Sequence, residues 1–272
     1  MLKVTLMQRL CVLIILFLGA CNTVEPQSTD TVQTLSENAQ SAVVNLNILN
    51  RDATLQSLAA ESDLLFSAHV EDVNTVSYTA DLNEQTFISL SDKPDVPSSA
   101  AWSIEASADI PVSYVVDVSD GAFNANLSNM NLPRFDIVSL NSTVDLTLPA
   151  SPFQLAVDSS DSTFNLNIPT NAGVQSAQIV SNGGIMSLNV EAGVSFIGNI
   201  AVTSGGLTIT VPQTTGVQII VESTSNSEIT LPDSSRITAD ATFYTTSNFG
   251  ESDSQILLNG ILNAAAIRIV QE

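Results

Sequence analysis

The chain has 272 residues, of which 28 are acidic and 7 are basic, so its formal net charge is −21 at pH 7. So acidic a chain lacks the basic surface that binds nucleic acid or attracts anionic membranes, and both are excluded as electrostatic partners. Charged residues make up only 13% of the chain. Its other polar residues are mostly Ser, Thr, Asn and Gln, which suit strand faces and turns.

Residues 1–20 have the features of a secretory signal peptide. Lys3 and Arg9 form a positive segment, and the stretch 10–18 that follows is almost purely apolar. This stretch is far shorter than the roughly 20 residues that span a bilayer as a helix. We therefore expect it to be removed on export rather than kept as a membrane span.

The segment Leu18-Gly19-Ala20-Cys21 resembles the lipobox of bacterial lipoproteins. The resemblance implies a lipid on Cys21 that anchors the protein in a membrane. The alternative is an ordinary signal peptide that leaves Cys21 as a free thiol, which is unusual in exported chains. Because Asn22 follows the cysteine instead of Asp, we expect the outer membrane in a cell with two membranes and the cell surface in a cell with one.

The remaining chain divides into a tether and a folded part. Residues 21–40 are polar and lack strand or helix periodicity, which predicts a flexible tether. Residues 41–110 contain irregular strand-like runs and are expected to form an N-terminal β-sheet that caps the following region, 111–272. We expect 41–272 to be one continuous domain, whose last segment, 261–267, is either part of a closing strand or a short helical turn.

Residues 112–232 contain a repeat with the period-2 alternation of β-strands. A clear copy is Thr163-Phe-Asn-Leu-Asn-Ile168, followed by Pro169. Six copies end in the apolar residues Leu127, Leu148, Ile168, Val190, Val211 and Leu231. The intervals between these residues are 21, 20, 22, 21 and 20. A period this constant predicts a stacked repeat architecture.

Each copy has a second strand about ten residues upstream, and Ser, Asn, Asp or Gly residues separate the two. Prolines that close several copies mark strand ends, because proline cannot donate to a sheet ladder. One rung cannot bury its apolar face alone, so neighbouring rungs must stack. The predicted fold class is all-β: short strands stacked in a β-solenoid or β-roll-like array with ~20-residue repeats, capped by a less regular N-terminal β-sheet.

The pattern resembles the toast-rack and related adhesin-like β-strand-repeat domains of bacterial cell-surface lipoproteins. The resemblance rests on the lipobox, the segments 102–104, 110–112 and 126–132, and the repeated copies that end in an apolar residue and Pro. It departs from those families where turns contain Ser or Asp in place of Gly. It implies a stacked-strand fold and a surface location, and no particular activity.

The sequence contains little catalytic or metal-binding chemistry. His69 is the only histidine, which leaves a histidine–cysteine zinc site and a Ser-His-Asp triad without support. Two acidic turns could supply oxygen ligands to calcium, from Asp117, Asp120, Asp158 and Asp161. Asp is also a common turn residue, so these are weak candidates. No cofactor is expected.

These features predict a surface-anchored, non-enzymatic binding or adhesion module. Its ligand would be a glycan, a cell-wall component or a protein. The alternatives are a structural envelope lipoprotein that contacts the wall or self-associates, and an extracellular carbohydrate-active enzyme. The enzyme is disfavoured because aromatic residues, which form sugar-stacking platforms, make up only 5% of the chain.

Overall fold

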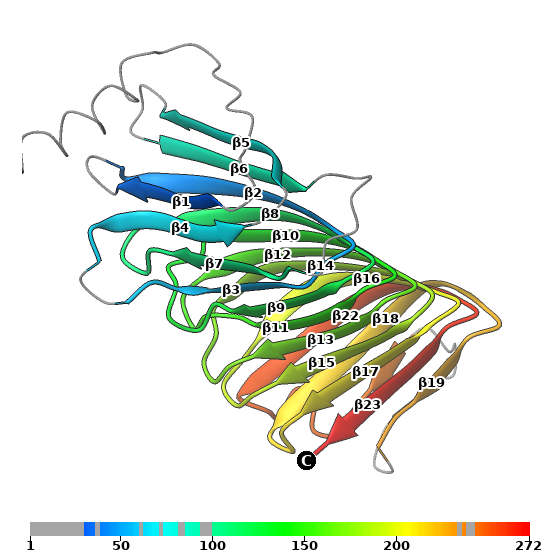
Figure 1. Ribbon diagram of the computed structural model, residues 1–272. Helices are drawn as coiled ribbons and strands as arrows, with labels where there is room; N and C mark the ends of the chain where they lie inside the picture. The colour runs from blue at the N-terminus through cyan, green and yellow to red at the C-terminus, as the bar shows by residue number, and fades with distance from the viewer. Residues whose placement is uncertain are drawn as a thin grey trace, which may run out of the picture.

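The described elements are all β-strands, which pack face to face as two large sheets (Figure 1). This computed structural model describes residues 30–35, 39–59, 62–70, 73–80, 85–92, 100–232, 236–237 and 243–272. The signal peptide, Cys21 and most of the expected tether lie outside these ranges, but residues 30–35 of the expected tether form a β-strand paired with residues 64–70. The prediction of an all-β fold built from stacked short strands is confirmed.

The first sheet, sheet A, has eleven strands. In spatial order they are β1 (Asp30–Leu35), β4 (Leu64–Val70), β7 (Trp102–Ala106), β3 (Ala53–Ser57), β9 (Ala122–Asn126), β11 (Thr143–Thr147), β13 (Thr163–Ile168), β15 (Ile185–Val190), β17 (Gly206–Val211), β23 (Ala266–Gln271) and β19 (Glu228–Thr230).

The second sheet, sheet B, has twelve strands. In spatial order they are β20 (Arg236–Ile237), β21 (Phe243–Thr245), β18 (Thr215–Ser225), β22 (Ser254–Asn263), β16 (Phe196–Thr203), β14 (Val174–Asn182), β12 (Phe153–Ser160), β10 (Arg134–Leu140), β8 (Val112–Ser119), β2 (Ser41–Leu49), β6 (Gln85–Asp92) and β5 (Val73–Ala80).

From β8 to β17 the rungs follow the chain in order. Each rung places one strand in sheet B and the next in sheet A, and neighbouring rungs pair in parallel and in register. Equivalent apolar residues therefore form columns across the strands. One column consists of Phe123, Val144, Phe164, Met186 and Leu207. The ~20-residue period in the sequence is the length of chain needed to make one rung.

The hydrophobic core lies between the two sheets. Along β13, for example, Phe164, Leu166 and Ile168 are buried, whereas the residues between them are at least partly exposed. This alternation arises because successive side chains of a strand point to opposite faces. Each large apolar side chain that is removed from water contributes about 1.5–3 kcal/mol, so the column, repeated rung after rung, stabilises the stack without disulfides.

The turn between the two strands of a rung contains one residue in the left-handed conformation, except between β14 and β15, where Gly183 and Gly184 both adopt it. Asn141, Asp161 and Ser204 have φ values of 49°, 50° and 52°. Each donates its backbone N–H to the next rung, with N···O distances of 3.1, 2.9 and 2.9 Å. Asn and Asp tolerate this conformation better than most residues. The Ser- and Asp-rich turns therefore take the place of the expected glycines.

Prolines end the ladders of sheet A. In β13 the N–H of Thr163 bonds to the Ser142 carbonyl, and alternate residues continue the series towards Pro169, which has no N–H to donate. The rung of β14 and β15 differs because Glu191 occupies the equivalent position. Its N–H donates to the Ile168 carbonyl at 2.9 Å. The sequence-based interpretation of the prolines as strand ends is consistent with this geometry.

Both ends of the stack depart from chain order. Strands β2 and β3 lie between β6/β7 and β8/β9, and strands β22 and β23 lie between β16/β17 and β18/β19. Figure 1 shows β22 and β23 as orange and red strands among yellow ones. From the repeat period alone, we would expect the copy that ends at Leu231 to pair directly with the copy that ends at Val211. Instead β23 separates them.

The interleaving changes how two terminal regions are interpreted. Within the segment 41–110, β2 and β3 are full members of the stack, and only the strands around them cap it. Within the segment 261–267, the chain forms the end of β22, a turn at Ala264 and the start of β23. The alternative of a helical turn there is wrong, because these residues pair in parallel with β16 and β18 in sheet B and with β17 and β19 in sheet A.

At three of the four sheet edges the outermost strands are antiparallel, whereas at the fourth β19 pairs with β23 in parallel. At the N-terminal end β4 pairs with β7 and β1 with β4, while β5 pairs with β6. At the other end β21 pairs with β18 and β20 with β21. These short, irregular strands cover part of the backbone edges that a parallel stack would otherwise expose, and they confirm the expectation of a less regular N-terminal cap.

Candidate binding faces

The predicted anchor, Cys21, lies outside the described residues, so the lipid attachment stays a prediction. Among the residues that the structure describes, none form a helix with the length and hydrophobicity needed to span a bilayer. His69 lies on β4 with its side chain exposed, opposite Ser103 of β7. It is not part of a catalytic arrangement with the acidic turns.

The four weak calcium candidates are spread over two surfaces. Asp117 and Asp158 point outward from sheet B on β8 and β12, and Val138 of β10 lies between them. Two strand spacings separate them, about 9.6 Å. Asp120 and Asp161 are left-handed turn residues of the same two rungs. Across the described ranges, no three His, Cys, Asp or Glu residues gather closely enough to hold a metal ion.

Asp117 nevertheless has an unusual environment. Burial raises the pKa of its carboxyl group above the ordinary value. Its neighbours across the sheet are Asn47 and the exposed Val138. Neither side chain carries a charge that would offset the loss of water. Asp117 is therefore a charge placed on a partly apolar surface rather than a ligand in a cluster.

The outer face of sheet A carries two columns of short polar side chains. In the rungs from β9 to β17 these are Asn124, Asp145, Asn165, Ser187 and Thr208 in the first column and Asn126, Thr147, Asn167, Asn189 and Thr210 in the second. Nine of these ten residues are uncharged. Neighbouring members of a column lie about 4.8 Å apart, the distance between strands. We call this surface the polar face.

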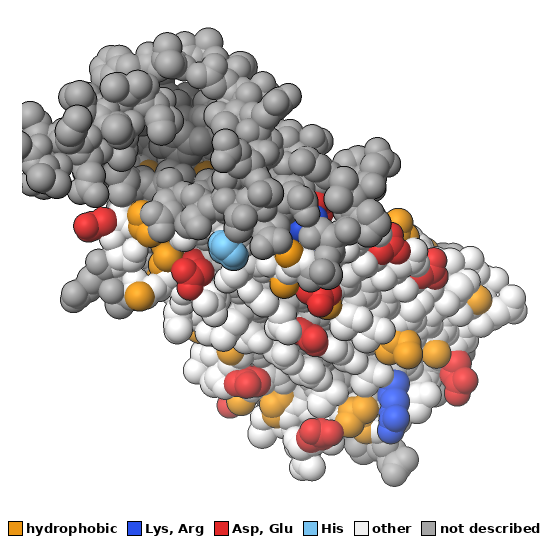
Figure 2. Space-filling model, in the orientation of Figure 1, with side chains coloured by type: hydrophobic (Ala, Val, Ile, Leu, Met, Phe, Trp, Pro, Cys, Tyr) orange, Lys and Arg blue, Asp and Glu red, His pale blue; other side chains and the backbone are white. Residues whose placement is uncertain are grey.

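Hydrogen bonds between rungs organise the polar face. Asn165 Nδ2 donates to Asp145 Oδ1 at 2.7 Å, and Asn189 Nδ2 donates to Asn167 Oδ1 at 2.9 Å. These bonds hold the amides in register while leaving further donors and acceptors directed at solvent. Figure 2, in the orientation of Figure 1, shows a surface with few, scattered acidic side chains and little basic surface.

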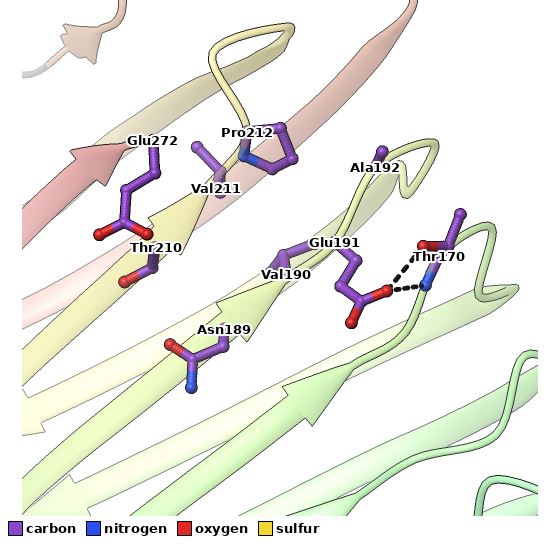
Figure 3. Close-up of a pocket in the computed structure, with 9 residues that line it drawn as sticks. All are labelled: Thr170, Asn189, Val190, Glu191, Ala192, Thr210, Val211, Pro212 and Glu272. Atoms are coloured by element: carbon purple, nitrogen blue, oxygen red, sulfur yellow. Dashed lines mark hydrogen bonds between the residues drawn. The ribbon is translucent and has the colours of Figure 1, made fainter.

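The second polar column ends in an open groove of about 460 Å³ (Figure 3). Asn189, Thr210, Glu191 and Glu272 are among its lining residues. The Glu191 carboxylate accepts hydrogen bonds from the backbone N–H and hydroxyl of Thr170, at 3.0 and 2.6 Å. These bonds lower the pKa of Glu191. A glycosidase needs a carboxylic acid with a raised pKa to protonate its leaving group, so Glu191 has the opposite property.

The outer face of sheet B differs from the polar face. Eight large hydrophobic side chains among the described residues are exposed, and seven lie on sheet B; only Ile185 belongs to sheet A. The seven are Phe87, Val115, Val138, Leu140, Ile197, Phe243 and Ile261. The two outer faces of the stack therefore offer different chemistry to a partner.

Sequence reasoning missed a buried ion pair at the N-terminal end. The Arg51 guanidinium donates through Nε and Nη2 to the two carboxylate oxygens of Asp92, at 2.5 and 2.7 Å, and both side chains are fully buried. Arg51 also lies 5.1 Å from the Trp102 ring centroid. The pair joins the turn after β2 to the end of β6. Bidentate pairing of this kind fixes geometry, and only the fold shows that residues 41 apart in sequence meet.

Comparisons with solved structures find distant similarity to three candidate adhesion proteins. No protein-family model matches the chain, and no curated protein matches it. A solved structure of a candidate cell adhesion protein from Clostridium sporogenes is 16% identical, with a TM-score of 0.43, over 90% of this chain and 99% of that one. A candidate adhesin from Bacteroides fragilis is 12% identical, with a TM-score of 0.37, over 91% and 100% of the two chains. A third, from Parabacteroides merdae, is 11% identical, with a TM-score of 0.34 and coverages of 91% and 98%.

Proposed function

We propose that this protein is a non-catalytic adhesion module, held at the cell envelope by a lipid on Cys21, whose polar face binds a neutral glycan chain. The observation that carries the proposal is the pair of columns that crosses five consecutive rungs, in which every residue except Asp145 is an uncharged amide or hydroxyl. Amides and hydroxyls both donate and accept hydrogen bonds. Sugar hydroxyls require partners of the same kind.

The charge distribution supports a neutral ligand. A net charge of −21 repels polyanions at long range, and the polar face has no row of basic side chains to counter that repulsion. Since the face is open and regular, each sugar would make few contacts. Affinity would then come from many weak contacts along a chain and from many anchored copies, which suits adhesion better than the capture of a small molecule.

The groove at the end of the polar face suits binding better than catalysis. The groove at the end of the polar face contains Glu191, but its lowered pKa keeps it ionised and makes it a poor proton donor. A carboxylate of this type can accept hydrogen bonds from a ligand. It suits a binding subsite at the end of the columns.

Two matched asparagine pairs provide the test. Asn167 and Asn189 form a hydrogen-bonded pair on sheet A, and Asn199 and Asn259 form a similar pair on sheet B. The full chain and two double alanine variants, one for each pair, are applied to an array of neutral and acidic glycans. We expect the wild type to retain neutral glycans.

The sheet A double variant should lose most of that binding, whereas the sheet B double variant should keep it. Melting temperatures of all three proteins provide the control for folding. Equal binding by the two variants, or retention of acidic glycans only, contradicts the proposal.

A further inference from the structure

Three adjacent strands of sheet B form an uncharged surface in which exposed aliphatic side chains lie among amides and hydroxyls. The strands β14, β16 and β22 contain no charged residue, in a chain whose net charge is −21. Two of the most exposed hydrophobic side chains, Ile197 at 63% and Ile261 at 53%, belong to β16 and β22. We call the outward side chains of these three strands the apolar face.

The strand register arranges the apolar face in three columns. The central column consists of the amides Gln178, Asn199 and Asn259. On one side lies the column Val180, Ala201 and Ile261, and on the other side lie Ile197 and Leu257. A row of amides is thus flanked on both sides by aliphatic side chains.

This arrangement is self-complementary. In a face-to-face dimer the two-fold axis lies in the plane of the interface, so the same patch meets itself. If that axis runs along the central column or along the strands, amides face amides and aliphatic columns face aliphatic columns. A shallow hollow of about 190 Å³ between Val180 and Ile261, over Ala201, offers space for an aliphatic side chain from the other copy, and Glu222 of β18 is also in its lining.

We propose that the apolar face binds a second copy of this chain. Two copies that each carry −21 repel one another over most of their surfaces. The three strands of the apolar face contribute no charge, so repulsion there is limited to bordering residues such as Asp158 and Glu222, and burying Ile197 and Ile261 would favour association.

The size of the face sets the strength of the contact. Three strand widths by about seven residues cover roughly 330 Å² per copy, so roughly 660 Å² in the pair. That area falls in the range of weak, transient interfaces. Anchoring many copies on one membrane raises their effective concentration and would make so weak a contact significant. This proposal does not depend on the glycan proposal, because the apolar face belongs to sheet B and the polar face belongs to sheet A.

Ile185 supplies a matched control for the test. It is 62% exposed, almost the same as Ile197, but lies on sheet A. The full chain and the variants Ile197→Asp and Ile185→Asp are compared by sedimentation velocity over a range of protein and salt concentrations. Both substitutions add one negative charge at an exposed position, so they differ only in the face that they change.

We expect wild type and Ile185→Asp to form dimers that increase with protein concentration and with salt, since salt screens the repulsion between copies. Ile197→Asp should weaken dimerisation by about tenfold or more, because a charge would be buried in the contact. A protein that stays monomeric throughout overturns the proposal, as do equal effects of the two variants.

The glycan array separates this proposal from the previous one. Ile197→Asp should retain glycan binding, and the sheet A asparagine variant should retain dimerisation. Loss of dimerisation in that asparagine variant would place the contact on sheet A and would overturn the inference drawn from the apolar face.

Discussion

In the middle of the stack, from β8 to β17, each rung contacts the rungs that precede and follow it in the chain. At the two ends, β2/β3 and β22/β23 lie between rungs that are distant from them in sequence. The middle is stabilised by a repeated apolar column, so one rung resembles the next. The N-terminal end depends on a specific contact, the buried pair of Arg51 and Asp92, which occurs once among the described residues.

The comparison shows how a repeat protein can end. A solenoid needs terminal elements that shield its last rung. Here the chain inserts its first and last rungs one position inward, so that each is paired on both sides. Residues far apart in sequence then hold the ends closed, and antiparallel strands cover three of the four outer edges.

The largest expected effect is at the N-terminal end. Arg51→Ala leaves the Asp92 carboxylate buried without its guanidinium, which should lower the free energy of unfolding by about 3–5 kcal/mol. Urea denaturation measures this loss. The control is Arg134→Ala, since Arg134 is exposed and pairs with Asp136 in the middle of the stack. An exposed pair contributes about 0–1 kcal/mol. Similar losses in both variants would contradict the special role of the end contact.

An intermediate effect is expected where the rung of β2 and β3 contacts the first rung of the middle, β8 and β9. A Cβ on Gly121 would lie 1.9 Å from the backbone oxygen of Arg51, so Gly121→Ala must displace the turn after β2. We expect a loss of about 1–3 kcal/mol, as for other overpacked sites. Gly206→Ala is the control, because the nearest atom to its new Cβ is 3.9 Å away. If thermal melting ranks the two variants in the reverse order, the junction is looser than described.

The smallest effect is expected on the surface of the middle. The folded state raises the pKa of Asp117 by burial, so its ionised form is less favourable there than in the unfolded chain. Stability from this group is therefore lost as the pH rises through the raised pKa and is fully present below the unfolded value of about 3.9. Asp117→Asn should stabilise the protein at neutral pH by a few tenths of a kcal/mol.

The gain from Asp117→Asn should disappear as the pH falls below about 4. Denaturation midpoints of the variant and the wild type, measured at a series of pH values, provide the check. A gain that persists at low pH would show that the effect does not arise from ionisation.

Much of the middle could be predicted from the sequence. The alternation of Phe164, Leu166 and Ile168 with polar residues identified the buried side of a strand, and the constant period identified the stack. Both patterns are local: a strand has a side-chain period of two, and each rung needs about twenty residues. The polar face could be anticipated in the same way, because residues such as Asn165 and Asn167 occupy the outward positions of a predicted strand.

The candidate sites were predicted less well. The acidic turns stood out because Asp117 and Asp120, or Asp158 and Asp161, are close in sequence. In the fold, the members of each pair point to different surfaces, so closeness in sequence did not produce a cluster. The apolar face could not be predicted because its residues are close in space but distant in sequence. Ile197 and Ile261 lie on adjacent strands but are 64 positions apart, and neither stands out in its own strand.

The sequence by itself determined the strands, their buried sides, their turns and the length of a rung, because these depend on neighbouring residues and on backbone geometry. Only the tertiary structure decided the order of the rungs at the two ends, the pairing of Arg51 with Asp92 and the contrast between the outer faces. Every rung presents nearly the same parallel edge, so the local pattern alone does not choose between neighbours. That choice depends on contacts that form only when the whole stack is assembled.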